Sequence, residues 1–218
     1  SPMDESVWYY TFFSGNISFA LGIGLIPLFH YWSLGVEEQY YLWYPWVVKY
    51  NKERVSRVVI ALCVIWFGLK MGSYVFLGKG LVYKIFSITR FDCMMIGAIG
   101  AILYYKKAAW FMRMCANRVV VILAWVLFFT SGLYAQYIPA PIRAEYISVV
   151  SLLVIMAGLV SKPLLENQVM NYLGKISYGI YVIHPLLIFV GSWVVKSTNM
   201  LSNTRGGGIG LYSQAFLH

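Results

Sequence analysis

The chain has 218 residues, of which 60% are hydrophobic and only 11% are charged. A soluble domain carries about a quarter charged residues and needs them to cover its surface, so this composition excludes an ordinary soluble protein and predicts one that lies in a lipid bilayer. The 17 basic residues exceed the 8 acidic residues by nine, but they form short clusters between apolar runs, as in the loops of membrane proteins. We therefore expect no binding to nucleic acid.

Apolar runs in chain order predict an all-α integral membrane protein, a polytopic transmembrane helix bundle with about six spans. The first run, residues 16–31, is short and interrupted by Gly22, Gly24 and Pro27, so it is expected to be a partial, re-entrant or interfacial segment. The later runs cover residues 35–50, 58–77, 85–105, 119–136, 146–161 and 176–196. No separate soluble domain is expected, and residues 1–218 form one predicted domain.

The distribution of basic residues in the loops predicts the orientation of the bundle. Loops 49–57, 106–118 and 162–175 contain ten basic residues, and the opposite set of loops contains five. Because short loops rich in Lys and Arg stay in the cytoplasm, the three basic loops are predicted to be cytoplasmic.

The stretch HYWSLGVEEQYYLWYP places two of the eight acidic residues side by side. Ser33 is expected to cap the N-terminus of the following helix, where the helix dipole favours the charges of Glu37 and Glu38. On one interpretation, one or both glutamates start this helix and have no further role. Alternatively, Glu37 lies on one stripe with Tyr41 and Tyr44, and this polar and aromatic stripe suits a protein cavity better than lipid.

Arg90 and Asp92 lie near the predicted outer end of the run 85–105. Residues two positions apart on a helix point roughly 200° apart, so these two side chains are not expected to pair with each other. Glu37 or Glu38 is the expected partner of Arg90. Such a pair is either a structural ion pair or a site that holds a substrate's carbonyl, phosphate or sugar hydroxyl groups.

Small residues follow Arg90 along the predicted helix. Arg90, Met94, Gly97 and Ala101 lie on one stripe, and small residues on such a stripe allow a neighbouring helix to approach closely. Arg90 is therefore expected to point into the bundle.

The last apolar run contains a polar stripe made of Ser177, Tyr181 and His184. Pro185 cannot donate a hydrogen bond to the carbonyl of Tyr181, so a kink and a free carbonyl group are expected there. The stripe is either a binding site or a set of hydrogen-bonded packing residues.

No metal site is expected. Cys63, Cys93 and Cys115 lie far apart without a CxxC pair, which argues against a zinc site and against a disulfide framework.

Four segments together resemble the acyltransferase 3 family of integral-membrane acyltransferases. They are YYTFFSGN (9–16), FHYWSLGVEEQYYLWYP (29–45), TRFDCMMIGAIGA (89–101) and LGKISYGIYVIHPLL (173–187). The resemblance implies transfer of an acyl group, commonly acetyl, from a cytoplasmic acyl-CoA to a hydroxyl group of a cell-envelope or exported glycan, which can be lipid-linked. It implies a multi-pass protein of the bacterial inner membrane, with the acyl-CoA as a donor substrate and no bound cofactor.

The resemblance also implies roles for particular residues. Arg90 is the expected oxyanion or phosphate ligand, Glu37 orients the acceptor or the base, and Asp92 completes the catalytic group. The residues expected to bind substrate are Ser33, Glu38, Tyr41, Ser177, Tyr181 and His184.

The sequence departs from the family pattern at both ends. The family's N-terminal helices carry an Arg and a His that this sequence lacks, so we expect a partial domain, truncated at both ends and inactive by itself. Two alternatives remain: a transporter or flippase whose polar residues line a path for an ion or a lipid-linked glycan, and a non-catalytic homologue.

Overall fold

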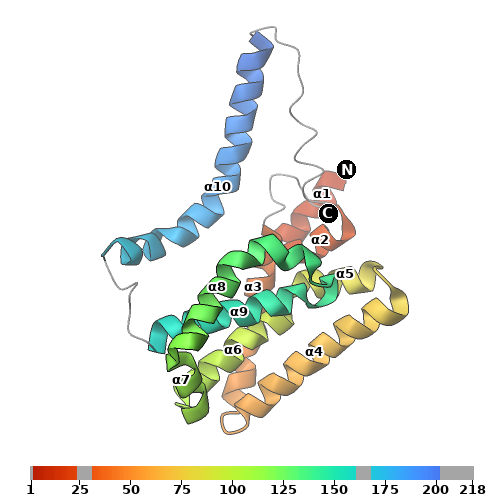
Figure 1. Cartoon of the computed structure of the whole chain (residues 1–218). Coiled ribbons are helices and arrows are strands. Elements are labelled where there is room, and N and C mark those ends of the chain that lie inside the picture. The colour runs from red at the N-terminus through yellow and green to blue at the C-terminus, as the bar shows by residue number, and fades with distance from the viewer. Residues whose placement is uncertain (1, 24–30, 161–167, 202–218) are drawn as a thin grey trace. The chain divides into compact units, whose positions relative to one another are not determined.

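The computed structural model describes residues 2–23, 31–160 and 168–201, and this part of the chain consists of helices and turns without a β-strand (Figure 1). The helices are α1 (Pro2–Thr11), α2 (Gly15–Leu21), α3 (Trp32–Tyr50), α4 (Val55–Leu77), α5 (Leu81–Thr89), α6 (Phe91–Tyr105), α7 (Ala109–Ala116), α8 (Arg118–Tyr134), the 3-10 helix η2 (Ala135–Tyr137), α9 (Ala140–Val160) and α10 (Gln168–Leu201). The predicted all-α fold is confirmed.

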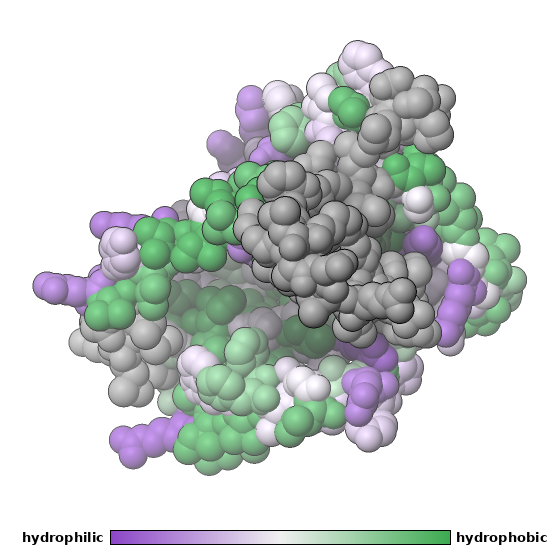
Figure 2. All heavy atoms as spheres, turned by 90° about the horizontal axis from the view of Figure 1, so that it is seen from above, coloured by the Kyte–Doolittle hydropathy of each residue, from purple (hydrophilic) through white to green (hydrophobic). Residues whose placement is uncertain are grey.

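Four described segments are long and apolar enough to cross a membrane: Val55–Leu77, Leu81–Tyr105, Arg118–Tyr137 and Ala140–Val160. Only 6% to 22% of the most apolar window of each is buried within the protein, so most of their apolar surface faces outward. Figure 2 shows such hydrophobic side chains at the surface. Lipid accepts this surface, and the helices satisfy their backbone hydrogen bonds internally. The protein is an integral membrane protein.

Within the described residues, four or five segments meet the length and apolarity of a membrane span, where the sequence predicted about six. The predicted run 35–50 forms α3, which carries Glu37, Glu38 and Lys49 and is not among the four apolar segments. Two parts of α10, Asn171–His184 and Leu186–Ser192, add a fifth if they cross together.

Within the predicted first run, α2 ends at Gly22, whose φ of 73° needs the left-handed conformation that glycine adopts easily. The part of that run from residue 24 to residue 30 lies outside the described residues.

Two of the predicted basic loops, 49–57 and 106–118, meet at one end of the bundle. The Lys106 Nζ atom donates a hydrogen bond to Ser56 Oγ at 2.9 Å, which joins the end of α6 to the first turn of α4. Phe111 and Cys115 of α7 pack with Met156 near the end of α9, and Figure 1 shows these helix ends on one side of the bundle. The predicted grouping therefore holds for loops 49–57 and 106–118. Residues 161–167 of the third basic loop lie outside the described residues, and the cytoplasmic location stays a prediction.

The helix α6 packs between α4 and α9. Its Met95 joins Tyr40 of α3 and Val55 and Val59 of α4 in a buried cluster. Aromatic rings surround this cluster, and Phe91 at the start of α6 lies with its ring centre 4.9 Å from that of Trp66. This packing fixes the start of α6, where the predicted Arg90 and Asp92 lie.

The predicted stripe of small residues on α6 faces the wrong way. Gly97 and Ala101 are exposed, and a Cβ atom at Gly97 would have nothing within 4 Å. The close approach is made by Gly100, which is buried and where a Cβ atom would lie 2.3 Å from a methyl group of Leu152 in α9. The helix α6 is therefore rotated relative to the prediction.

The chain divides into two compact units, residues 1–170 and 171–218. The first contains the helices α1 to α9, and the second contains nearly all of α10.

Candidate functional site

Three of the motif segments are joined by one hydrogen-bonded network. The Asn16 Nδ2 atom donates to Gln39 Oε1 at 3.2 Å and to Thr89 Oγ1 at 3.3 Å. In return, Gln39 Nε2 donates to Asn16 Oδ1 at 3.0 Å and to the carbonyl of Phe13 at 2.9 Å. Asn16 and Thr89 are buried, so these bonds replace those that water would make. The network ties α2 and the turn before it to α3 and to the end of α5.

A close backbone contact supports the same junction. A Cβ atom at Gly35 of α3 would lie 2.8 Å from the carbonyl oxygen of Phe13 and 3.2 Å from the nitrogen of Gly15. Only glycine leaves room for α3 to approach this turn so closely. The glycine of the WSLGVEEQ segment is therefore required by packing.

Arg90 joins the helices α5 and α6 with a φ of 47°, a left-handed conformation that is uncommon for residues other than glycine. Its Nε atom donates to the carbonyl of Ser87 at 3.3 Å. Its guanidinium carbon lies 5.1 Å from the centre of the Trp32 ring, within the range of a cation–π interaction. The arginine of one motif thus rests on the tryptophan of another.

Two expectations about Arg90 are wrong. Arg90 interrupts the helix, so the stripe drawn through it does not exist, and its side chain is exposed. Among the described residues, no carboxylate lies within ion-pair distance of Arg90, and neither Glu37 nor Glu38 is its partner. The break in the helix redirects the side chain toward Trp32.

Asp92 forms a buried ion pair with a residue that the sequence analysis did not select. The Lys70 Nζ atom of α4 lies 2.7 Å from Asp92 Oδ2, and the two side chains are 3% and 1% exposed. The same ammonium group contacts Glu145 Oε1 of α9. Asp92 Oδ1 also accepts a hydrogen bond from the backbone nitrogen of Cys93 at 2.9 Å, at the N-terminus of α6. We call Lys70, Asp92 and Glu145 the buried ion triad.

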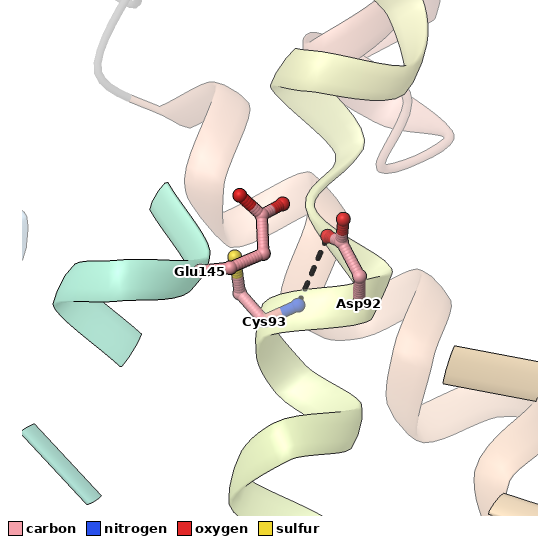
Figure 3. Close-up of side chains that lie close together, drawn as sticks. All are labelled: Asp92, Cys93 and Glu145. Atoms are coloured by element: carbon pink, nitrogen blue, oxygen red, sulfur yellow. Dashed lines mark hydrogen bonds between the residues drawn. The ribbon is translucent and has the colours of Figure 1, made fainter. Parts of the chain in front are cut away.

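Asp92, Cys93 and Glu145 lie close enough together to share a cation, with ligand atoms within 4.8 Å of one another (Figure 3). The Lys70 ammonium, however, contacts both carboxylates. It supplies one positive charge between the two carboxylates, so the triad keeps one net negative charge.

The sequence contained a signal for the missed members of the triad. Lys70 is the one charged residue between Val58 and Leu77, and Glu145 is the one acidic residue in the segment Ala140–Val160. Ionisable residues within apolar spans are expensive in lipid and normally find partners in the bundle. This rule selects both residues, although it does not say that they pair with Asp92.

The helix α3 buries a different face from the predicted one. Gly35, Val36 and Tyr40 are buried, whereas Glu37 and Tyr41 are exposed, as is Glu38. Partial burial, and then the neighbouring Glu38 carboxylate, raise the pKa of Glu37, which lies outside the four apolar segments. Within the described residues, the expected cavity-facing stripe through Glu37 and Tyr41 is therefore not formed.

Ser33 does not cap α3. The helix begins at Trp32 with Tyr31 in the capping position, and no acidic residue lies in its first turn. The expectation that the glutamates start this helix is wrong as well, since they lie one turn further along.

The predicted polar stripe of the last span lies in the second unit. The Ser177 hydroxyl donates to the carbonyl of Gly174 at 2.8 Å. The Nδ1 atom of His184 lies 2.8 Å from the carbonyl oxygen of Tyr181, so the carbonyl that Pro185 releases is engaged by a neighbouring side chain instead of being free. The two parts of α10 on either side of Pro185 meet at 45°, which confirms the predicted kink.

A cavity of about 290 Å³ lies beside the buried ion triad. It is bordered by side chains from α4, from the α5–α6 junction and from α9, among them Lys70, Ser87, Arg90, Cys93, Arg143 and Ser148. Arg90 is thus one of the predicted site residues, and it borders this cavity. Asp92 does not line it and acts on it only through Lys70.

Comparison with known proteins gives one family match. The model of the acyltransferase domain named acyltransferase 3 matches residues 3–210. The chain belongs to the acyltransferase 3 family. Residues 3–210 are accordingly an acyltransferase domain, in agreement with the resemblance of the four motif segments, three of which meet at the junction described above.

The chain is also similar to curated proteins. It is 25% identical over 211 residues to the O-acetyltransferase OatA of Staphylococcus aureus, in strains NCTC 8325 / PS 47, COL and MRSA252. The alignment covers 88% of this chain and 34% of each of those proteins, so the chain spans about a third of their length. No solved structure matches the chain.

Proposed function

We propose that the protein transfers an acyl group, preferentially acetyl, from a cytoplasmic acyl-CoA to a hydroxyl group of a cell-envelope or exported glycan at the bacterial inner membrane. The observation that carries this proposal is the family match over residues 3–210, supported by the similarity to an O-acetyltransferase. The membrane location agrees with it, because donor and acceptor would reach the protein from opposite sides.

The proposed reaction needs a nucleophile, a base and a group that stabilises negative charge. The acceptor hydroxyl oxygen attacks the thioester carbonyl carbon, so that a C–O bond forms and the C–S bond breaks. The hydroxyl proton passes to a base, and coenzyme A leaves as the thiol. Negative charge develops on the carbonyl oxygen in the transition state and has to be stabilised by a hydrogen-bond donor or a cation.

The geometry favours Arg90 as the group that stabilises negative charge on the carbonyl oxygen. Arg90 borders the cavity, and its guanidinium group contacts the Trp32 ring and the Ser87 carbonyl. The remaining N–H groups can donate to a carbonyl oxygen or to a phosphate group. Because Arg90 sits in a strained backbone conformation, its position is fixed by the surrounding packing, as is common at functional sites.

Asp92 is better suited to position the site than to act as its base. Its carboxylate is fully buried and is occupied by Lys70 and by the Cys93 backbone. It therefore holds the Lys70 ammonium at the wall of the cavity. Glu37, which is exposed on α3, remains the proposed residue for orienting the acceptor or the base, and Ser177, Tyr181 and His184 remain proposed lining residues of a substrate path.

The test uses the full-length protein in membrane vesicles with acetyl-CoA that carries a labelled acetyl group. Transfer is followed by alkali-labile label on the glycan and by release of the coenzyme A thiol. For Arg90→Gln we expect kcat/KM to fall by about 100-fold or more, the typical effect of removing a transition-state donor, with partial recovery in Arg90→Lys.

Lys84→Gln is the matched control, because Lys84 is exposed on α5 and does not line the cavity. Its kcat/KM should stay within about twofold of the unmodified protein. Movement of a solute without any release of thiol would instead identify a transporter and would overturn the proposed function.

A further inference from the structure

The cavity beside the buried ion triad is bordered by three basic side chains from three parts of the chain. Lys70 comes from α4, Arg90 from the junction of α5 and α6, and Arg143 from the first turn of α9. The volume of about 290 Å³ is at the lower end for small-molecule sites and suits a small polar group. We call this space the three-cation cavity.

The charges around the cavity do not balance. Lys70 is neutralised by Asp92 and Glu145. Arg90 and Arg143, in contrast, have no carboxylate within ion-pair distance among the described residues. Two positive charges therefore remain at the border of the cavity, against one surplus negative charge in the triad behind Lys70.

Backbone carbonyl groups hold both arginines in place without neutralising them. Arg143 donates from Nε to the carbonyl of Ile138 at 3.3 Å and from Nη2 to the carbonyl of Gln136 at 3.3 Å. Arg90 donates to the carbonyl of Ser87. An arginine held in this way keeps further N–H donors in a fixed geometry, and such donors bind phosphate and carboxylate groups well.

The position of the arginines along the apolar segments makes an anionic ligand favourable. Arg90 lies within the apolar segment Leu81–Tyr105, and Arg143 lies near the start of the apolar segment Ala140–Val160. A charged side chain within such a segment is costly unless it faces a partner or a polar cavity. An oxyanion in the cavity would provide that partner for Arg90 and for Arg143.

We propose that the three-cation cavity binds an oxyanion, a phosphate or carboxylate group, that is part of the acyl acceptor. This inference rests on the proposed function, because it names the chemistry of the acceptor at the same site. A phosphate would come from a lipid carrier of the glycan, and a carboxylate would come from an acidic sugar. The anion anchors the acceptor so that its hydroxyl group lies near Arg90.

The experiment measures binding without any acyl donor, so it is independent of acyl transfer. The full-length protein is placed in nanodiscs of phosphatidylcholine, and equilibrium dialysis against empty nanodiscs compares two labelled pairs of probes. Farnesyl phosphate is compared with neutral farnesol, and glucuronate is compared with neutral glucose. We expect one anionic probe to bind saturably and more tightly than its neutral partner, which also identifies the source of the oxyanion.

The variant Arg143→Gln should weaken binding of that anionic probe by about tenfold or more, as expected for the loss of a charge-assisted hydrogen bond. Arg143→Lys keeps the charge and should retain most of the affinity, and Lys84→Gln should leave it unchanged. In acyl-transfer assays Arg143→Gln should raise KM for the acceptor with little change in kcat. Raising the salt concentration from about 50 mM to about 500 mM should weaken binding of the anionic probe to the unmodified protein but not of the neutral one.

The proposal is overturned if neither anionic probe binds more tightly than its neutral partner. It is also overturned if Arg143→Gln binds as the unmodified protein does, or if Arg143→Lys loses as much affinity as Arg143→Gln. If Arg143→Gln does not fold, the salt dependence of the unmodified protein decides. Failure of acyl transfer with intact anion binding would instead count against the proposed function alone.

Discussion

Replacement of Lys70 by Met tests whether the buried ion triad holds the bundle together. The ammonium lies 2.7 Å from Asp92 Oδ2 and contacts Glu145, with only 3% of the Lys70 side chain exposed. At an effective dielectric constant of about 20, a pair at this distance has an interaction energy of roughly 6 kcal/mol. The loss of the lysine's own burial penalty offsets part of this energy.

Measured losses from breaking a buried pair on one side are about 3–5 kcal/mol. We therefore expect Lys70→Met to reduce the free energy of unfolding by about 3–5 kcal/mol, because two carboxylates are left facing each other without a cation. Methionine fills a similar volume, so a cavity does not contribute much to this loss. The assay is unfolding in mixed detergent micelles with increasing SDS, followed by tryptophan fluorescence and circular dichroism.

Two further variants separate the effect of the lost charge from a general loss of stability caused by any substitution. Lys84→Met removes an exposed lysine of α5 and should change the free energy of unfolding by less than about 0.5 kcal/mol. The triple variant Lys70→Met/Asp92→Asn/Glu145→Gln removes all three charges and should recover much of the lost stability. A Lys70→Met protein within about 1 kcal/mol of the unmodified protein would refute the reasoning, since the triad would then carry little net interaction energy.

Other parts of the junction give further predictions. Gly35→Ala should lose about 1–3 kcal/mol of stability in the same SDS titration, because the new methyl group would lie 2.8 Å from a backbone oxygen. The control Gly68→Ala should be neutral or stabilising, because a Cβ atom there would have nothing within 4 Å. Asn16→Ala should lose about 1–3 kcal/mol, because it leaves buried hydrogen-bond partners unsatisfied, and a neutral result would contradict the network. Glu37→Gln should leave stability within about 0.5 kcal/mol, since the side chain is exposed, while its acyl transfer falls further than that of Glu38→Gln; equal losses of activity would argue against a separate role for Glu37.

The pattern of apolar runs in the sequence was enough to predict the fold class. The apolar runs are long enough to span a bilayer, and in lipid the backbone has to form its hydrogen bonds within each segment. For this reason the sequence alone predicted an all-α membrane bundle, the approximate limits of its later helices and the kink at Pro185. Charge in loops 49–57 and 106–118 likewise predicted that these helix ends lie together, because those ends follow from the alternation of the spans.

Side-chain direction was less predictable. The stripes through Glu37 and through Arg90 assumed continuous helices that begin at the expected residues. The helix α3 begins at Trp32, and Arg90 interrupts the helix between α5 and α6. The break at Arg90 changes the direction of every side chain that follows it. In α3 the stripe is continuous, but the neighbouring helices bury the face with Gly35, Val36 and Tyr40 instead.

The sequence by itself determined which chemical groups are present and which segments resemble the family: the adjacent glutamates, the Arg-x-Asp pair and the polar stripe of the last span. Only the tertiary structure decided the partners. It paired Asp92 with Lys70 and Glu145, placed Arg90 on Trp32, and joined Asn16, Gln39 and Thr89. These residues are separated by 22 to 73 positions in the chain. No local rule links residues so far apart, because their contacts depend on how the helices α3, α4, α6 and α9 pack against one another.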